Sequence, residues 1–402
     1  MLHAQAAPLE IDATGKGLLG MSPEVFLRDY WQKQPLLIRN AFPDFVSPIE
    51  PEDLAGLACE DGVLARLIEH DKTKDAWAVR HGPFAEEDFP GMPDHDWTLL
   101  VQDVDKWDVD VRALLAQFDF LPRWRIDDIM ISFAARGGSV GAHVDQYDVF
   151  LLQAQGQRHW QIDAGANPPQ GFRHDVELKL LREFHPSHDW VLQPGDMLYL
   201  PPGVPHHGVA VDACLTISVG MRAPAAAELL GDYVDTLAAD APDALRYTDA
   251  DLGLPADPNE IDAAAIQRVH AALQQLQMDD PDRFGDWFGE FITTYRSAVL
   301  PVAADHPPSL DVTEQALAEG ACLLRHPWSR MAWRRSHRAD ATHALLYAGG
   351  VSYPLAPADA QQLAAADVVD ASLHAGLSDA GRNAVMALLA AGHYQLVEED
   401  AE

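Results

Sequence analysis

Cysteine is scarce in this chain, which has 3 cysteines among 402 residues. Cys59, Cys214 and Cys322 lie far apart in the sequence. This spacing argues against a disulfide framework and against a zinc ribbon, and it is typical of proteins in a reducing compartment.

Long apolar runs are also missing. We find no run approaching the length of about 18 apolar residues that a membrane-spanning helix requires. The N-terminus lacks the basic segment followed by an apolar segment that marks a secretory signal. We therefore expect a cytoplasmic protein that is neither exported nor inserted into a membrane.

Positive charge is the third scarcity, because 28 Lys and Arg face 62 Asp and Glu and the formal net charge is −34. Phosphate binding requires a cationic surface, so this balance argues against nucleic acid as a direct partner. An arginine cluster near the C-terminus is the one feature that favours it: Arg325, Arg330, Arg334, Arg335 and Arg338. The acidity has two open interpretations, namely simple solubility or attraction to a basic macromolecule.

The first 120 residues mix helical and strand patterns. Ser22-Pro23-Glu24 supplies a helix start, and 36–39 reads as a strand after Pro35. Residues 51–70 and 97–118 show helical spacing of apolar side chains, so we expect helices there.

From residue 126 to residue 221 the pattern changes to short apolar runs separated by Gly and Pro turns. Strands are expected at 129–133, 149–154, 158–162, 189–192, 197–200 and twice within 209–222. Many short strands with such turns are typical of a double-sheet jelly roll.

Helical patterns return after Pro224, at 225–237, 261–278 and 283–299. After a linker at 303–308 the order is helix, short strands and two helices, which is compatible with a winged helix. The last five residues, 398–402, read as a frayed tail. We thus predict an α+β chain with a jelly-roll core in 1–223, a helical region in 224–302 and a winged-helix-like domain in 303–402.

The richest motif is His143-Val144-Asp145, followed later by the Pro-rich loop that ends at His206. Residues at i and i+2 of a strand face the same side, so the first pair shares one face. Two imidazoles and a carboxylate form the facial triad of non-haem Fe(II) centres, which leaves coordination positions open. Asp is unfavourable in strands, which makes a purely structural role for Asp145 less attractive.

Two points in this pattern stay open. His207 competes with His206 as the third ligand, although it would face the opposite side of an extended chain. Arg158 could hold a carboxylate with its planar fork, or it could be an ordinary surface arginine on an alternating strand.

The segments 141–150 and 201–206 together resemble the cupin-type JmjC oxygenases. Within these, the chain is similar to bacterial ribosomal oxygenases, which hydroxylate an arginine of large-subunit ribosomal protein L-sixteen. Further similar segments are 26–39, 100–104, 218–224 and 287–291. The last 90 or so residues match only in general organisation.

The resemblance implies a double-stranded β-helix (jelly-roll) core, a helical homodimerisation region and a C-terminal winged helix. It implies Fe(II) on His143, Asp145 and His206, with O2 and 2-oxoglutarate as cosubstrates. It implies that Arg158 grips the distal carboxylate of 2-oxoglutarate, with Ser132 as a polar helper. Its substrate contacts are less sharply encoded, and Tyr147 and Asp148 are the candidates.

The implied activity is that of a 2-oxoglutarate-dependent dioxygenase which hydroxylates an arginine of L-sixteen at Cβ. The alternatives are a related oxygenase that acts on another protein, such as a histidyl hydroxylase or a lysine demethylase, and a metal-binding cupin without redox turnover.

Overall fold

The computed structural model describes residues 8–254, 257, 259–276, 278, 280–336 and 343–397. The predicted frayed tail and Arg338 lie outside these residues. The chain divides between Ala223 and Pro224 into two compact units. No helix in the described residues is long and apolar enough to cross a membrane.

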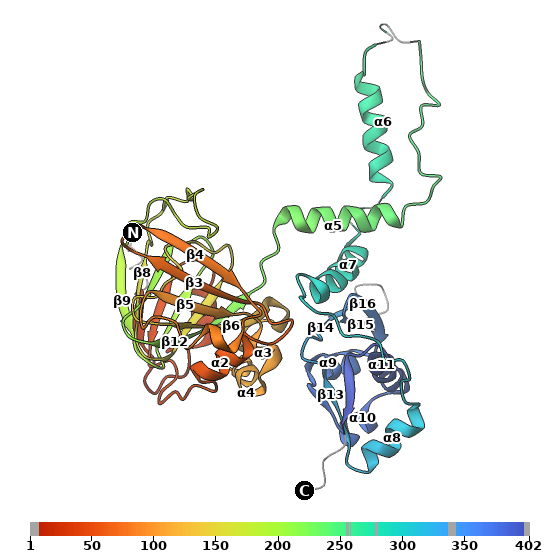
Figure 1. The fold of residues 1–402 in the computed structure, drawn as a ribbon. Helices are drawn as coiled ribbons and strands as arrows, with labels where there is room; N and C mark the ends of the chain where they lie inside the picture. The colour runs from red at the N-terminus through yellow and green to blue at the C-terminus, as the bar shows by residue number, and fades with distance from the viewer. Residues whose placement is uncertain are drawn as a thin grey trace, which may run out of the picture. The chain divides into compact units, whose positions relative to one another are not determined.

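The first unit is built on two facing sheets (Figure 1). The large sheet has nine strands, in the spatial order β1 (Glu10–Asp12), β2 (Leu36–Arg39), β10 (Met197–Leu200), β7 (Val149–Gln155), β12 (Cys214–Met221), β6 (Ile126–Ala134), β5 (Trp97–Val101), β3 (Ala65–Asp71) and β4 (Ala76–His81). The small sheet has the order β11 (His206–Ala210), β8 (Arg158–Ile162) and β9 (His188–Leu192). The predicted jelly-roll core is confirmed.

Helices cover one face of the large sheet. They are α1 (Pro23–Asp29), α2 (Pro51–Leu57), α3 (Val104–Trp107) and α4 (Val109–Ala113), with short 3-10 turns η1 (Glu86–Asp88), η2 (Leu114–Phe118) and η3 (Arg123–Arg125). Phe26 of α1 is fully buried against Phe150 and Tyr199 of the sheet. Each such side chain stabilises the fold by roughly 1.5–3 kcal/mol.

The opposite face of the large sheet is turned to the small sheet. Leu151 and Leu198 pack there against Trp160 and Ile162. Because side chains alternate along a strand, β7 and β10 contribute side chains both to the core under the helices and to the layer between the two sheets. The candidate site residues on β6, β8 and β11 described below lie in this inner layer, between the sheets.

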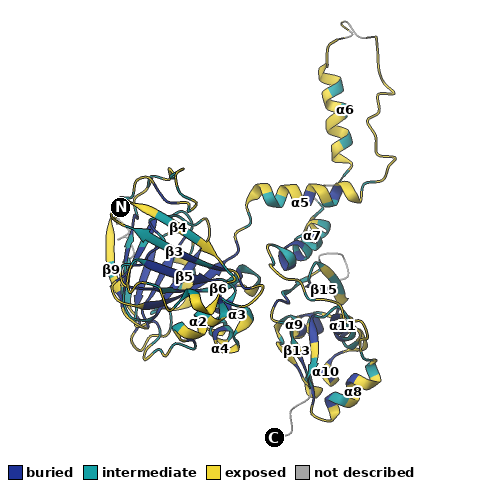
Figure 2. Cartoon of the chain, in the orientation of Figure 1, coloured by how far each residue is buried: buried dark blue, intermediate teal, exposed yellow. Residues whose placement is uncertain are grey.

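Two helix predictions are wrong in part. Residues 97–101 form β5, an interior strand of the large sheet in which every residue is buried (dark blue in Figure 2). A strand covered on both faces shows no alternation, and its apolar run therefore looked helical together with α3. Likewise, the helix expected at 51–70 is α2 followed by strand β3.

The second unit begins with α5 (Ala226–Ala239), α6 (Ala263–Gln274) and α7 (Pro281–Thr294). The elements that follow are α8 (Leu310–Ala318), β13 (Cys322–Arg325), β14 (Met331–Arg335), β15 (Ala344–Ala348), β16 (Val351–Leu355), α9 (Pro357–Ala365), β17 (Val368–Val369), α10 (Ala371–Gly376), α11 (Asp379–Ala390) and β18 (Tyr394–Val397). Their strands form two three-stranded sheets, in the orders β17-β13-β18 and β14-β15-β16.

Two arginines of the C-terminal cluster, Arg325 and Arg334, make contacts within this unit. Arg334 pairs with Asp282 and Asp286 of α7 and so ties that helix to β14. Arg325 donates to three carbonyls at the end of α9 and pairs with Asp367. Two of the five arginines in the cluster are therefore engaged within the fold.

Candidate metal centre

Backbone pairing brings His143 and His206 side by side. The His143 N–H donates to the His206 carbonyl at 3.0 Å, and the His206 N–H donates back at 2.9 Å. Asp145 is held in the same way, because its carbonyl accepts from Gly203 N–H at 2.7 Å. The Pro-rich loop thus delivers His206 beside a pair that lies far away in the sequence.

The two imidazoles are oriented by their Nδ1 atoms. Nδ1 of His143 hydrogen-bonds the Gly141 carbonyl at 3.0 Å, and Nδ1 of His206 hydrogen-bonds the Val204 carbonyl at 3.0 Å. A carbonyl only accepts, so each Nδ1 carries the proton and each Nε2 keeps a free lone pair.

Both Nε2 atoms face one carboxylate oxygen. Asp145 Oδ2 lies 3.6 Å from His206 Nε2 and 3.9 Å from His143 Nε2. The three ligand atoms lie within 4.8 Å of one another, and no other trio in the described part of the chain meets this condition. Two nitrogens and one oxygen on one side of a point are what a facial metal triad requires.

Burial also favours metal binding at His206, which is 2% exposed. Burial and the neighbouring His143 lower the pKa of His206 to about 4, although Asp145 opposes this shift. The imidazole is therefore neutral at pH 7, and neutral imidazole is the form that ligates a metal.

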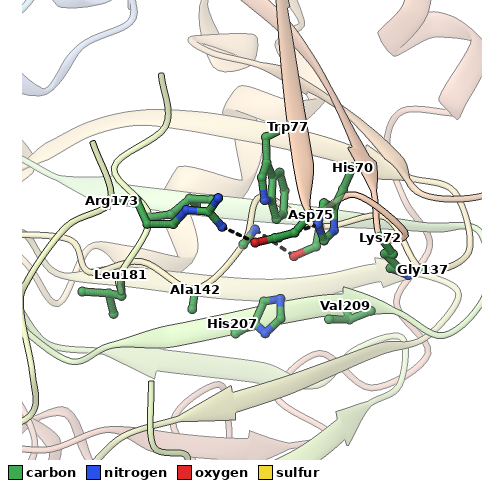
Figure 3. Close-up of a pocket in the computed structure, with 13 residues that line it drawn as sticks. His70, Lys72, Asp75, Trp77, Gly137, Ala142, Arg173, Leu181, His207 and Val209 are labelled. Atoms are coloured by element: carbon green, nitrogen blue, oxygen red, sulfur yellow. Dashed lines mark hydrogen bonds and ion pairs between the residues drawn. The ribbon is translucent and has the colours of Figure 1, made fainter. Parts of the chain in front are cut away.

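His207 points away from this centre. It lines a separate cavity of about 260 Å³, together with Ala142 and Leu181 and with Trp77 opposite (Figure 3). His206 and His207 alternate as neighbours in β11 should, so one faces the triad and the other faces the cavity behind it. Of the two histidines that the sequence left open, the structure brings His206 to the pair.

Arg158 lies on the inner face of the small sheet and is 2% exposed. Its Nη1 is 3.4 Å from Ser132 Oγ and its Nη2 is 3.5 Å from the Gly208 carbonyl. Burial lowers its pKa, and it pairs with no carboxylate among the described residues. A buried guanidinium without a counter-ion is costly unless an anionic ligand completes it. The site is therefore suited to a carboxylate.

Tyr147 stands next to the triad. The Asp145 carboxylate lies near its hydroxyl, and burial together with this carboxylate raises the pKa of Tyr147. The residue is nevertheless 41% exposed, so part of its ring is open to an incoming ligand.

Asp128 is a site residue that the sequence interpretation missed. It lies on the same face of β6 as Ser132, and its charge reaches Tyr147. Burial and three neighbouring aspartates raise its pKa to about 7. One oxygen accepts from Asp103 N–H, and no cation pairs with it in the described residues. An acid on a strand, four positions before Ser132, was the available signal.

Asp148 requires a correction. It is fully buried, and its carboxylate accepts hydrogen bonds from Tyr199 (2.7 Å), Gln32 (2.8 Å) and Arg125 (3.1 Å). All three donors belong to the chain itself, so Asp148 is a structural carboxylate and not a contact for a substrate.

Family comparisons agree with this geometry. A JmjC domain model matches residues 113–229, and a ROXA-like winged helix model matches residues 275–395. An AraC-like ligand binding domain model matches residues 185–283. The ribosomal protein uL16 3-hydroxylase of Escherichia coli is 39% identical over 301 residues, which cover 75% of this chain and 79% of that protein.

The chain belongs to the JmjC ribosomal oxygenase family. A probable ribosomal oxygenase of Haemophilus influenzae is 38% identical over 261 residues, covering 64% of each chain. The X-ray structure of E. coli ycfD superposes with a TM-score of 0.83 at 32% identity, over 94% of this chain and 99% of that one. A second ycfD structure, a complex with cobalt and 2-oxoglutarate, gives 0.80 at 33% identity over 94% and 99%. The predicted fold, including the winged helix of the JmjC ribosomal oxygenases, is confirmed.

Proposed function

We propose that this chain is an Fe(II)- and 2-oxoglutarate-dependent oxygenase that hydroxylates Cβ of an arginine in ribosomal protein L-sixteen (uL16). The observation that carries the proposal is the pairing of an open triad with a buried, uncompensated Arg158 in one inner layer of the jelly roll. The E. coli relative, named for uL16 hydroxylation, supports the substrate.

His143, Asp145 and His206 would hold the iron through two nitrogens and one oxygen. This mixed donor set fits Fe(II) and leaves one side of the metal free. Bound iron with 2-oxoglutarate and O2 supplies the oxidation of an unactivated C–H bond. The protein fixes the orientation of both imidazoles through Gly141 and Val204, and burial keeps His206 neutral.

Arg158 would hold the carboxylate of 2-oxoglutarate that is far from the metal. A guanidinium offers two parallel N–H donors to a carboxylate, which gives both strength and direction. Ser132 lies within reach of Nη1 and would add a hydroxyl. The ycfD complex with cobalt and 2-oxoglutarate supports 2-oxoglutarate as the ligand of the site.

Asp128 and Tyr147 would receive the target arginine. A guanidinium supplies the cation that Asp128 lacks, and the exposed part of Tyr147 offers a flat surface beside it. The net charge of −34 would attract a basic ribosomal protein and accelerate encounter.

The helical region would join two copies of the chain. Apolar side chains of α6 are exposed on one face at 266, 269 and 273, and most of that helix is yellow in Figure 2. A homodimer would bury this face. We retain 1–223 as the oxygenase domain, 224–302 as the dimerisation region and 303–402 as the winged helix. We place the activity in the cytoplasm, where the ribosomal substrate is made.

The direct test is mass spectrometry of an L-sixteen peptide after incubation with the protein, Fe(II), 2-oxoglutarate and O2. One added oxygen atom on an arginine, absent with His206→Ala, is the expected result. Succinate formation without peptide oxidation would keep the oxygenase chemistry and contradict the substrate. Neither product would favour a cupin that binds metal without turnover.

A further inference from the structure

Trp160 contacts both halves of the proposed site. The guanidinium carbon of Arg158 lies 5.2 Å from the centre of its ring, and the His206 ring lies 5.8 Å away. Trp160 is itself 5% exposed, so neither contact is shared with solvent. One rigid side chain therefore spans from the carboxylate anchor to a metal ligand.

Gly208 explains why the two side chains meet there. It is the cross-strand partner of Trp160 in the β8–β11 pair. A Cβ on Gly208 would lie 2.7 Å from Arg158 Nε and 2.8 Å from the Trp160 ring. Both groups thus pack on the same α-carbon, which only glycine permits.

This packing orients the guanidinium. Arg158 Nε is buried and has no hydrogen-bond partner in the described structure. An aromatic face beside it is the group available to interact with that cation. The two terminal nitrogens reach Ser132 Oγ and the Gly208 carbonyl at 3.4 and 3.5 Å, and their remaining N–H groups can donate to a ligand.

Hydrogen bonding of the indole does not account for the choice of tryptophan. The Trp160 indole N–H is buried and also lacks a hydrogen-bond partner. An unsatisfied buried donor costs free energy, and a phenyl ring would avoid that cost. Such an unsatisfied buried donor calls for an explanation, and the contacts of the ring with Arg158 and His206 offer one.

We propose that Trp160 is a positioning residue that sets which length of 2-oxo diacid the site accepts. This rests on the proposed function, in which Arg158 holds one end of the cosubstrate and the metal on His206 holds the other. Because the indole touches both, it fixes the distance between them. A diacid one methylene longer than 2-oxoglutarate would not fit that distance.

The test measures binding, without turnover, to the full-length Mn(II)-loaded protein by titration calorimetry. The ligands are 2-oxoglutarate and 2-oxoadipate, which is one methylene longer. The variants are Trp160→Phe and Trp160→Leu. The control is Trp190→Phe, because Trp190 is the cross-strand neighbour of Trp160 on the adjacent strand β9 but donates its N–H to Glu10 at 3.1 Å.

We expect the wild type to prefer 2-oxoglutarate. In Trp160→Leu its affinity falls by about tenfold, the size of a buried cation–π contact, and the preference over 2-oxoadipate shrinks. Trp160→Phe retains an aromatic face and much of the core volume, so it keeps part of the affinity for 2-oxoglutarate and part of the preference. Trp190→Phe changes neither.

The outcomes distinguish failure of the Trp160 proposal from failure of the proposed function. If folded Trp160 variants weaken both diacids equally, or keep the wild-type preference, Trp160 is not a length determinant. The same holds if the wild type shows no preference. If the wild type binds neither diacid, the proposed function itself fails.

Discussion

His143 and His206 exchange backbone hydrogen bonds in both directions, at 3.0 and 2.9 Å. This bridge lies outside the regular ladders of the two sheets and joins the segment before β7 to the start of β11. It places both Nε2 atoms on the side of Asp145 before any metal binds. The triad is therefore preorganised by main-chain geometry, and side-chain changes at the ligands can remove the metal without removing the fold.

Asp145→Ala tests this separation. Loss of the one anionic donor should weaken Fe(II) or Mn(II) binding by more than about a hundredfold. Asp145 makes its backbone bond to Gly203 through its carbonyl, which the substitution keeps. Calorimetric metal titration and urea unfolding are the two measurements. An unchanged metal affinity would remove Asp145 from the ligand set.

Asp148→Ala is the contrasting variant, three residues along the chain. It leaves Arg125, Gln32 and the buried Tyr199 hydroxyl without their shared acceptor, so the free energy of unfolding should fall by about 3 kcal/mol. The metal affinity of the folded protein should stay at the wild-type value. Weaker metal binding at unchanged stability would reverse our assignment of Asp148 as structural.

The local parts of the site could be predicted from the sequence. His143, Asp145 and the Pro-rich loop before His206 are short patterns, and strand alternation within each pattern gives the direction of the side chains. Arg158 was identified but left undecided, because burial decides whether it is a surface residue. The burial of Arg158 depends on strands β6 and β12 of the large sheet, which carry Ser132 and Cys214 next to its guanidinium.

Other parts depended on strand pairing that no local pattern shows. The proposed role of Trp160 needs Gly208 opposite to it, and Asp128 matters because its end of β6 approaches Tyr147. The strand β5 was mistaken for a helix because it is buried on both faces. In each case the missing information was which strand lies alongside.

Arg158→Met should separate affinity from stability. Removal of the guanidinium should weaken 2-oxoglutarate binding by about a hundredfold, since charge-assisted hydrogen bonds are lost. The free energy of unfolding should not fall, because a buried cation without a counter-ion gives way to an apolar chain of similar length. Cosubstrate titration and urea unfolding measure the two effects. Unchanged binding would show that another residue holds the carboxylate.

The exposed face of α6 predicts the oligomeric state. Val269 and Leu273 are 47% and 53% exposed. We expect a dimer that the double variant Val269→Asp, Leu273→Asp converts to a monomer, measured by sedimentation. Val312→Asp on α8, at a position that is 53% exposed, is the matched control and should remain dimeric. A monomeric wild type would exclude this role for α6.

Asp128 gives substrate binding a dependence on pH. Burial and neighbouring aspartates raise its pKa to about 7, so below that pH it is mostly protonated and cannot pair with a guanidinium. Binding of an arginine peptide should therefore strengthen as the pH rises through about 7. Asp128→Asn should bind the peptide weakly and lose this dependence, while 2-oxoglutarate binding stays unchanged.

The same raised pKa has a consequence for stability, and its sign is opposite. The folded state retains the Asp128 proton up to a higher pH than the unfolded state, whose carboxyl titrates near its model value of 3.8. The contribution of Asp128 to the free energy of unfolding is therefore complete below about pH 3.8 and declines as the pH rises to about 7. Asp128→Asn should lose less stability than the wild type between pH 4 and pH 7 in urea unfolding. A variant that follows the wild-type stability curve, or that keeps the pH dependence of peptide binding, would show that a different group titrates.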